Sequence, residues 1–191
     1  MTEDRSSVLA DYISENRIEP VKLHLACGGD KWHDFVNVDL YPETDASTDT
    51  SRVGCVADVF ADLRSLGLPD DSVDEIFCSH ALEHFPRWVG VEILVDWHRM
   101  LRSGGRLHLE TPDFWRSVFW LFHPWRRKRK LARNMFFGNQ WDELEYETHR
   151  YLWTARELKD VLFSIGFSSA KVNHASLTHH PGRDIKAIAF K

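Results

Sequence analysis

The sequence predicts an α/β fold built on a mainly parallel sheet with one antiparallel terminal strand. Short apolar runs, typical of buried strands, alternate along the chain with segments whose apolar residues recur at a helical period. Two further runs near the C-terminus, separated by a turn through Pro181-Gly182, indicate a hairpin. Polar residues follow several of the predicted strands, and the carboxyl ends of parallel strands share one edge of a sheet. We therefore expect a ligand site at that edge.

The individual elements follow from local patterns. Apolar residues at a helical spacing predict a helix over 87–101, and Ser103-Gly104-Gly105 is expected to end it. Thr154 predicts the N-cap of a later helix, with Glu157 completing a capping box and Gly166 as the C-cap. In chain order, we expect a helix over 6–16, strands over 22–26, 35–39, 54–58 and 75–79, the helix over 87–101, a strand over 106–110, the helix over 154–165, and strands over 167–172 and 185–190.

Length and composition favour a single domain over residues 1–191. The chain is 43% hydrophobic and 28% charged with a formal net charge of −5, and this balance suggests neither a nucleic-acid protein nor a membrane protein. The three cysteines are widely spaced and lie in or beside apolar runs, as buried free thiols do. No long apolar run occurs and the N-terminus is polar, so we predict no membrane span and a cytoplasmic location.

The stretch 21–40 carries the first chemical signal. Its sequence is VKLHLACGGDKWHDFVNVDL, in which a glycine turn follows one apolar run and Asp39 ends the next. Small residues let a ligand approach the backbone, and a carboxylate accepts hydrogen bonds from ribose hydroxyls. The turn alone leaves two interpretations open, a nucleotide-type site and a purely structural turn.

Several segments in order resemble one family. They are LHLACGG, FVNVDL, ADVFADLRSLGLPDDSVDEIFCSHALEHF, HRMLRSGGRLHLETPD and GFSSAKV. Over roughly residues 21–191 the chain resembles the S-adenosylmethionine-dependent methyltransferases with a Rossmann-like fold, and it is most similar to the small methyltransferase type 11-like proteins. The resemblance implies a seven-stranded sheet with helices on both faces and S-adenosyl-L-methionine as the cofactor.

The resemblance also assigns cofactor contacts. Ala26, Cys27, Gly28 and Gly29 match the loop beside the methionine and ribose of the cofactor. Asp39, followed by Leu40, matches the acidic residue that binds the ribose. Asp58 with Val59 matches the adenine position, and Ser79 with His80 matches the segment near the transferable methyl group.

The chain departs from the family pattern in two ways. Ala26 stands where the loop usually opens with glycine, and His24 stands where an acidic residue is frequent. Only eleven residues separate Cys27 from Asp39, so we expect the first crossover helix to be shortened or replaced by a loop.

The pentapeptide His80-Ala-Leu-Glu-His84 also satisfies the H-x-x-E-H pattern of some zinc peptidases. On a helix, His80 and His84 would share one face. The pattern begins directly after a predicted strand and has no obvious third ligand, so we predict no metal site. We expect His80 to line the cofactor pocket, and Glu83 and His84 to brace the following helix.

The segment of about 113–152 is long for a connection and is predicted to be an inserted lid or substrate-binding element. Its tryptophans, including Trp115, Trp120 and Trp141, either line an acceptor pocket or form a small core of the insert. Its basic run at 126–133 is either a solvated helix face or a contact for nucleic acid, anionic lipid or a phosphorylated substrate. His149 and Asp113 are the candidates for a catalytic base.

Together these features predict methyl transfer from S-adenosyl-L-methionine to an oxygen or nitrogen of a small-molecule or glycan-like acceptor. One alternative is a nucleic-acid methyltransferase that uses the run 126–133, although no D/N-P-P-Y type motif follows the fourth strand. Another is a non-catalytic methyltransferase-like binding module. The oligomeric state stays open.

Overall fold

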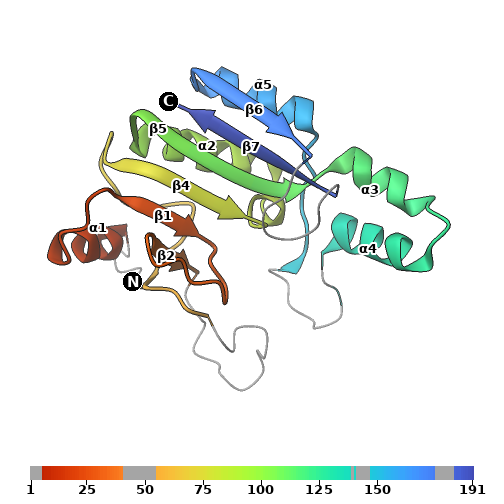
Figure 1. Ribbon diagram of the computed structural model, residues 1–191, viewed down its shortest axis with the longest axis horizontal. Coiled ribbons are helices and arrows are strands. Elements are labelled where there is room, and N and C mark those ends of the chain that lie inside the picture. Colours follow the sequence, from red (N-terminus) through yellow and green to blue (C-terminus); the bar gives the residue numbers. More distant parts are fainter. Residues whose placement is uncertain (1–5, 41–54, 139, 141–146, 175–182) are drawn as a thin grey trace.

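The computed structural model describes residues 6–40, 55–138, 140, 147–174 and 183–191. Seven strands form one sheet, and α3 and α4 lie together at one end of the molecule (Figure 1). The elements are α1 (Ser6–Glu15), β1 (Lys22–Leu25), β2 (Val36–Asp39), β3 (Val59–Phe60), β4 (Val73–Ser79), the 3₁₀ turn η2 (Leu82–His84), α2 (Arg87–Met100), β5 (Leu101–Pro112), α3 (Phe114–Leu121), α4 (Arg126–Phe137), α5 (Ala155–Ile165), β6 (Ser169–Asn173) and β7 (Asp184–Phe190).

The strand order is β3-β2-β1-β4-β5-β7-β6. The pairs from β3 to β5 are parallel, and β7 is antiparallel to both of its neighbours, β5 and β6. The predicted α/β fold, a mostly parallel seven-stranded sheet with one reversed terminal strand, is therefore confirmed. The predicted turn at Pro181-Gly182 lies outside the described residues.

Two predicted boundaries were wrong. The third strand is Val59–Phe60 and does not end at Asp58, because pairing with β2 begins opposite Val38. The fifth strand begins at Leu101, directly after α2, because Leu101 already has an extended backbone with φ −63° and ψ 139°. The Ser103-Gly104-Gly105 segment thus lies within β5 and does not end the helix.

The caps of α5 were largely predicted. The Thr154 hydroxyl accepts a hydrogen bond from the backbone N–H of Glu157 at 3.1 Å, and Gly166 ends the helix with φ +121°. The Glu157 carboxylate bonds instead to Arg87 Nε and to the Tyr151 hydroxyl, both at 2.7 Å. Only one half of the capping box is therefore formed, and the other half ties α5 to α2.

The two faces of the sheet differ in chemistry. Helices α2 and α5 lie against one face, where leucine, isoleucine and alanine side chains form the core (Figure 1). On the other face His24, Phe77 and His108 lie side by side on β1, β4 and β5. The Trp32 ring covers them, with its centroid 4.2 Å from that of Phe77 and 4.7 Å from that of His24.

Trp32 belongs to the connection between β1 and β2, which contains no helix over residues 26–35. The predicted replacement of the first crossover helix by a loop is thus observed. None of the helices within the described ranges has the length and apolar character needed to cross a membrane.

Candidate cofactor and acceptor site

The loop after β1 is clasped to the end of β2. The backbone N–H of Gly28 donates to Asp39 Oδ2 at 2.6 Å, and the N–H of Leu40 donates to Asp39 Oδ1 at 2.7 Å. Ala26 and Gly28 both have left-handed backbone, with φ of 55° and 52°. A Cβ at Gly28 would meet no atom within 4 Å, so open space adjoins the turn. The structure therefore brings the predicted loop and the predicted ribose carboxylate together.

Cys27 is buried within this loop. Burial, followed by the nearby Asp39 carboxylate and the Cys55 thiol, raises the pKa of the Cys27 thiol well above its ordinary value. The thiol therefore stays protonated and does not serve as a nucleophile. Gly29, by contrast, is exposed on the outside of the turn.

Asp58 is held beside β2 by hydrogen bonds. Its carboxylate accepts hydrogen bonds from Lys31 Nζ at 2.6 Å and from Asn37 Nδ2 at 2.8 Å and backbone N at 3.0 Å. Although burial opposes the charge, these bonds lower the pKa of Asp58. The side chain stands beside the middle of β2, whereas Val59 is buried in β3. Neither residue lies beyond a carboxyl end of the sheet.

Asp62 lies beyond the carboxyl end of β3, where Asp58 was predicted to lie. It follows β3 by two residues, and the N–H of the preceding Ala61 donates to the carbonyl oxygen of Asp39 at 2.9 Å. Its carboxylate accepts from the backbone N–H of Arg64 at 2.9 Å. The signal was present in the segment ADVFAD, which holds two carboxylates where only the first was considered.

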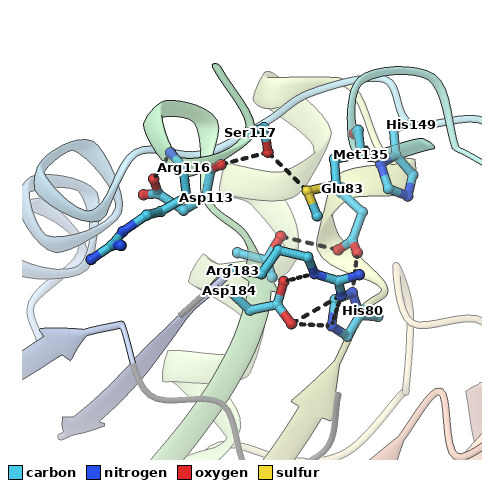
Figure 2. Close-up of polar contacts among 10 residues, drawn as sticks. His80, Glu83, Asp113, Arg116, Ser117, Met135, His149, Arg183 and Asp184 are labelled. Carbon is cyan, nitrogen blue, oxygen red and sulfur yellow. Dashed lines mark hydrogen bonds and ion pairs between the residues drawn. The ribbon is translucent and has the colours of Figure 1, made fainter. Parts of the chain in front are cut away.

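A buried polar network follows the carboxyl end of β4 (Figure 2). His80, with φ +55°, places Nδ1 2.9 Å from Glu83 Oε1 and Nε2 3.2 Å from Asp184 Oδ2. Thr111 on β5 donates its hydroxyl to Glu83 Oε2 at 3.1 Å. Arg183 donates to both carboxylate oxygens of Asp184. The network thus joins β4, η2, β5 and β7.

The charges of this network are complementary. Burial opposes protonation of His80, but its bonds to Asp184 and Glu83 raise its pKa to about 9. Burial likewise opposes the charge on Glu83, yet the bond to His80 lowers the pKa of that carboxyl to about 2. At neutral pH the imidazolium therefore lies between two carboxylates, and His80 does not act as a base.

The zinc-peptidase pattern does not form a peptidase site. Residues 82–84 make a single 3₁₀ turn, so His80 and His84 do not share a helix face. His84 and His149 nevertheless stack edge to face at 4.9 Å between ring centroids, and ligand atoms of Glu83, His84 and His149 lie within 4.8 Å of one another. A second such group is Cys27, Asp39 and Cys55. Both Glu83 oxygens already accept hydrogen bonds, so the first group is explained without an ion.

His149 has the properties of a neutral imidazole. Burial lowers its pKa, with a smaller opposing effect from Glu83. Its Nδ1 lies 2.5 Å from the carbonyl oxygen of Met135, so Nδ1 carries the proton and Nε2 carries the lone pair. His149 lines a cavity of about 370 Å³. The other lining residues are Phe114, Phe136, Arg150, Tyr151, Leu152, Thr154 and Glu157, and none of them is a predicted cofactor contact.

Asp113 is the N-cap of α3. Its Oδ1 accepts from the backbone N–H of Arg116 at 2.7 Å, and the residue is 1% exposed. Its carbonyl oxygen accepts from the Ser117 hydroxyl, which also contacts Met135 Sδ at 3.1 Å (Figure 2). The two candidate bases are thus connected through α3 and α4 and through the bridge between Asp113 and Trp153, and the Asp113 carboxylate is used as a helix cap.

A family model matches part of the chain. Residues 22–109 match the type 11 family described as Methyltransferase domain. No curated protein matches the chain.

Solved structures share the fold over the whole chain. An S-adenosylmethionine-dependent methyltransferase from Archaeoglobus fulgidus is 15% identical with a TM-score of 0.60, covering 98% of this chain and 95% of that one. A possible histamine N-methyltransferase from Thermotoga maritima is 17% identical with a TM-score of 0.56, covering 98% and 94%. A putative methyltransferase of Haloferax volcanii, solved with the Trm112 methyltransferase activator, is 12% identical with a TM-score of 0.56, covering 100% and 98%.

The chain has the Rossmann-like fold of these S-adenosylmethionine-dependent methyltransferases. Within it, residues 22–109 match a methyltransferase domain. The predicted enzyme class and cofactor are confirmed at this level.

Proposed function

We propose that the protein transfers the methyl group of S-adenosylmethionine to an oxygen or nitrogen of a small-molecule or glycan-like acceptor. The observation that carries the cofactor site is the clasp between Gly28 and Asp39, with open space beside the turn. The cofactor supplies a methyl group on a sulfonium sulfur. The protein's contribution is to position donor and acceptor in line and to remove a proton where the acceptor is a hydroxyl.

In this proposal Asp39 accepts the ribose hydroxyls while it holds the loop from 26 to 29. Asp62 takes the adenine role in place of Asp58, because Asp62 follows the carboxyl end of β3 and Asp58 precedes that strand. Both carboxylates have a basic partner, Arg64 for Asp62 and Lys31 for Asp58. Ser79 stands at the carboxyl end of β4, beside the proposed methionine site. His80 helps to form this side of the proposed site through its bonds to Glu83 and Asp184, and it does not transfer a proton.

We assign the base role to His149. A neutral imidazole with its lone pair on Nε2 and its Nδ1–H fixed by a backbone carbonyl is suited to accept a proton. The cavity beside it offers aromatic rings and the Tyr151 hydroxyl to an acceptor. Asp113 keeps its structural role as the cap of α3.

The segment of about 113–152, which includes α3 and α4, is proposed as the acceptor-side element of a single domain. A cytoplasmic location is supported by the three free cysteines. Trp141, one of the tryptophans predicted to line the acceptor pocket, lies outside the described residues.

Isothermal titration with S-adenosylmethionine and S-adenosylhomocysteine tests the cofactor site. Removing Asp39 deletes charged hydrogen bonds worth about 1.5–3 kcal/mol each, so Asp39→Ala should weaken binding by roughly 10- to 100-fold. Asp160→Ala, on the exposed face of α5, is the matched control and should bind as the wild type does. If neither ligand binds the wild-type protein, the chain is a non-catalytic module and the enzyme proposal fails.

The choice between two carboxylates has its own test. Asp62→Asn should weaken cofactor binding, and Asp58→Asn should leave it within a few-fold of the wild type. A larger loss for Asp58→Asn would return the adenine role to Asp58.

A further inference from the structure

The α3–α4 hairpin (residues 114–137) differs sharply in composition from the rest of the chain. It holds seven of the 24 Lys and Arg residues and none of the 29 Asp and Glu residues, so the remainder carries a net charge of −12. It also holds eight of the 24 aromatic residues in an eighth of the length. The two helices pack together and lie at one end of the molecule, away from α2 and α5 (Figure 1).

Helix α3 presents its apolar side to the outside. Ser117 is fully buried, because its hydroxyl bonds to the Asp113 carbonyl oxygen and contacts Met135 of α4. The opposite stripe carries Trp115, Phe119 and Phe122, which are 57%, 69% and 83% exposed. A surface helix ordinarily turns its polar side to water, so this orientation indicates a surface that meets an apolar partner.

Helix α4 supplies the positive charge. Arg126, Arg129 and Arg133 recur at helical spacing and, with Leu121 of α3, line a hollow of about 340 Å³. Trp125, which precedes them, is 68% exposed. Guanidinium groups bind phosphate oxygens in pairs of parallel hydrogen bonds, so three of them around one hollow suit a phosphate group.

We propose that the α3–α4 hairpin docks the protein on the surface of an anionic lipid bilayer. The aromatic stripe of α3 enters the interface between headgroups and acyl chains, and the arginines of α4 bind lipid phosphates. Aromatic rings on one helix beside cations on the next are a pattern of interfacial helices. Lys128 of α4 lies over the rings of Trp120 and Trp125, with Nζ 5.0 and 5.5 Å from their centroids. Among the described residues no such cation lies over the exposed stripe of α3, whereas single-stranded nucleic acid needs cations beside the rings on which its bases stack.

A second copy of the chain is a poor occupant of the same face. Two hairpins of seven positive charges each would meet without a single carboxylate between them. The like charges would repel at close range, whereas an anionic membrane neutralises them.

Flotation with unilamellar vesicles tests this proposal on the full chain. Vesicles of phosphatidylcholine and phosphatidylglycerol should carry the protein, vesicles of phosphatidylcholine alone should not, and added salt should weaken the binding. The double variants Phe119→Ser/Phe122→Ser and Arg126→Ala/Arg133→Ala should each lower the bound fraction by about tenfold. The controls Trp88→Ser and Arg156→Ala change an equally exposed aromatic residue and an exposed arginine on other helices, and should bind as the wild type does.

Three outcomes overturn the proposal. One is no binding to anionic vesicles by a wild-type protein whose thermal unfolding shows it to be folded. Another is binding lost equally in the two control variants, which would mean nonspecific adsorption. The third is that the protein does not bind vesicles but is retained on a single-stranded RNA oligonucleotide, and that both double variants abolish this retention. The hairpin would then be a nucleic-acid surface. Inorganic phosphate that fails to compete with the vesicles supports the bilayer over a free anion.

Discussion

The ion pairs of His80 with Asp184 and Glu83 should make the stability of the protein depend on pH. Because the folded protein raises the pKa of His80 from 6.5 to about 9, it binds this proton more tightly than the unfolded chain does. The stabilisation is present in full below pH 6.5 and is lost as the pH rises through 9. At about 1.4 kcal/mol for each pKa unit, the loss amounts to roughly 3 kcal/mol.

The acid side has the opposite sign. The pKa of Glu83 falls from 4.5 to about 2 in the folded protein, so its stabilisation is present above pH 4.5 and is lost as the pH falls through 2. The two shifts describe the same ion pair and are not added. The contribution of the pair to stability should therefore be greatest between about pH 4.5 and 6.5.

Glu83→Gln is the informative perturbation. It removes the charge and keeps an oxygen that can accept from His80 Nδ1, so it should lower the pKa of His80 and reduce the free energy of unfolding by about 3 kcal/mol at pH 6. Glu157→Gln is the matched control, because that carboxylate bonds to Arg87 and Tyr151 and contacts no histidine.

Urea unfolding between pH 5 and 9 measures these effects. The wild-type free energy of unfolding should fall between pH 6.5 and 9. The fall should be smaller in Glu83→Gln, in which Asp184 still pairs with His80, and Glu157→Gln should keep the full slope. A wild-type protein with constant stability across this range, or a Glu83→Gln variant with an unchanged slope, would refute the reasoning.

Two further predictions concern backbone positions. Ala26→Gly removes a side chain from left-handed backbone, so the free energy of unfolding should rise by up to about 1 kcal/mol. Thermal or urea unfolding measures this, and cofactor binding should not be lost. A clear destabilisation would contradict the left-handed φ of Ala26. Gly138→Ala places a Cβ 1.8 Å from the carbonyl oxygen of Glu147 and must displace the segment leading to His149. The free energy of unfolding should fall by at least about 2 kcal/mol, and any measured methyl transfer should fall more than cofactor affinity. Equal losses of the two would argue against His149 as the base.

Strands with apolar runs were predictable from the sequence, and those without them were not. β1 and β2 alternate buried apolar residues with polar ones, and β4 contains the buried apolar run 76–78, which marks these strands locally. β3 is two residues long and pairs only with β2, so no pattern in its own segment fixes its bounds. The misplaced strand led directly to the choice of Asp58 over Asp62.

The site was predictable only where its parts are close in the sequence. Gly28 and Asp39 follow two neighbouring parallel strands joined by a short loop, so their proximity could be predicted from the strand order. Asp184 lies 104 residues from His80, and no sequence pattern near His80 predicts that an acidic residue this far along the chain is its partner. The proposed choice of His149 over Asp113 rests on the N-cap role of Asp113 and on the packing of α4 beside His149, which no local sequence pattern gives.

Glu83 is hydrogen-bonded both to the end of β4 and to the segment that carries His149. Its side chain holds His80 at the end of β4, while its carbonyl oxygen accepts the N–H groups of Arg150 and Tyr151 at 2.8 and 3.2 Å. These hydrogen bonds set the distance between His80, at the end of β4, and the segment carrying His149, and they leave little room for that distance to change. If α3 and α4 form the acceptor side as proposed, acceptors of different size are accommodated by this hairpin, and its exchange should change selectivity while the bonds of Glu83 stay constant.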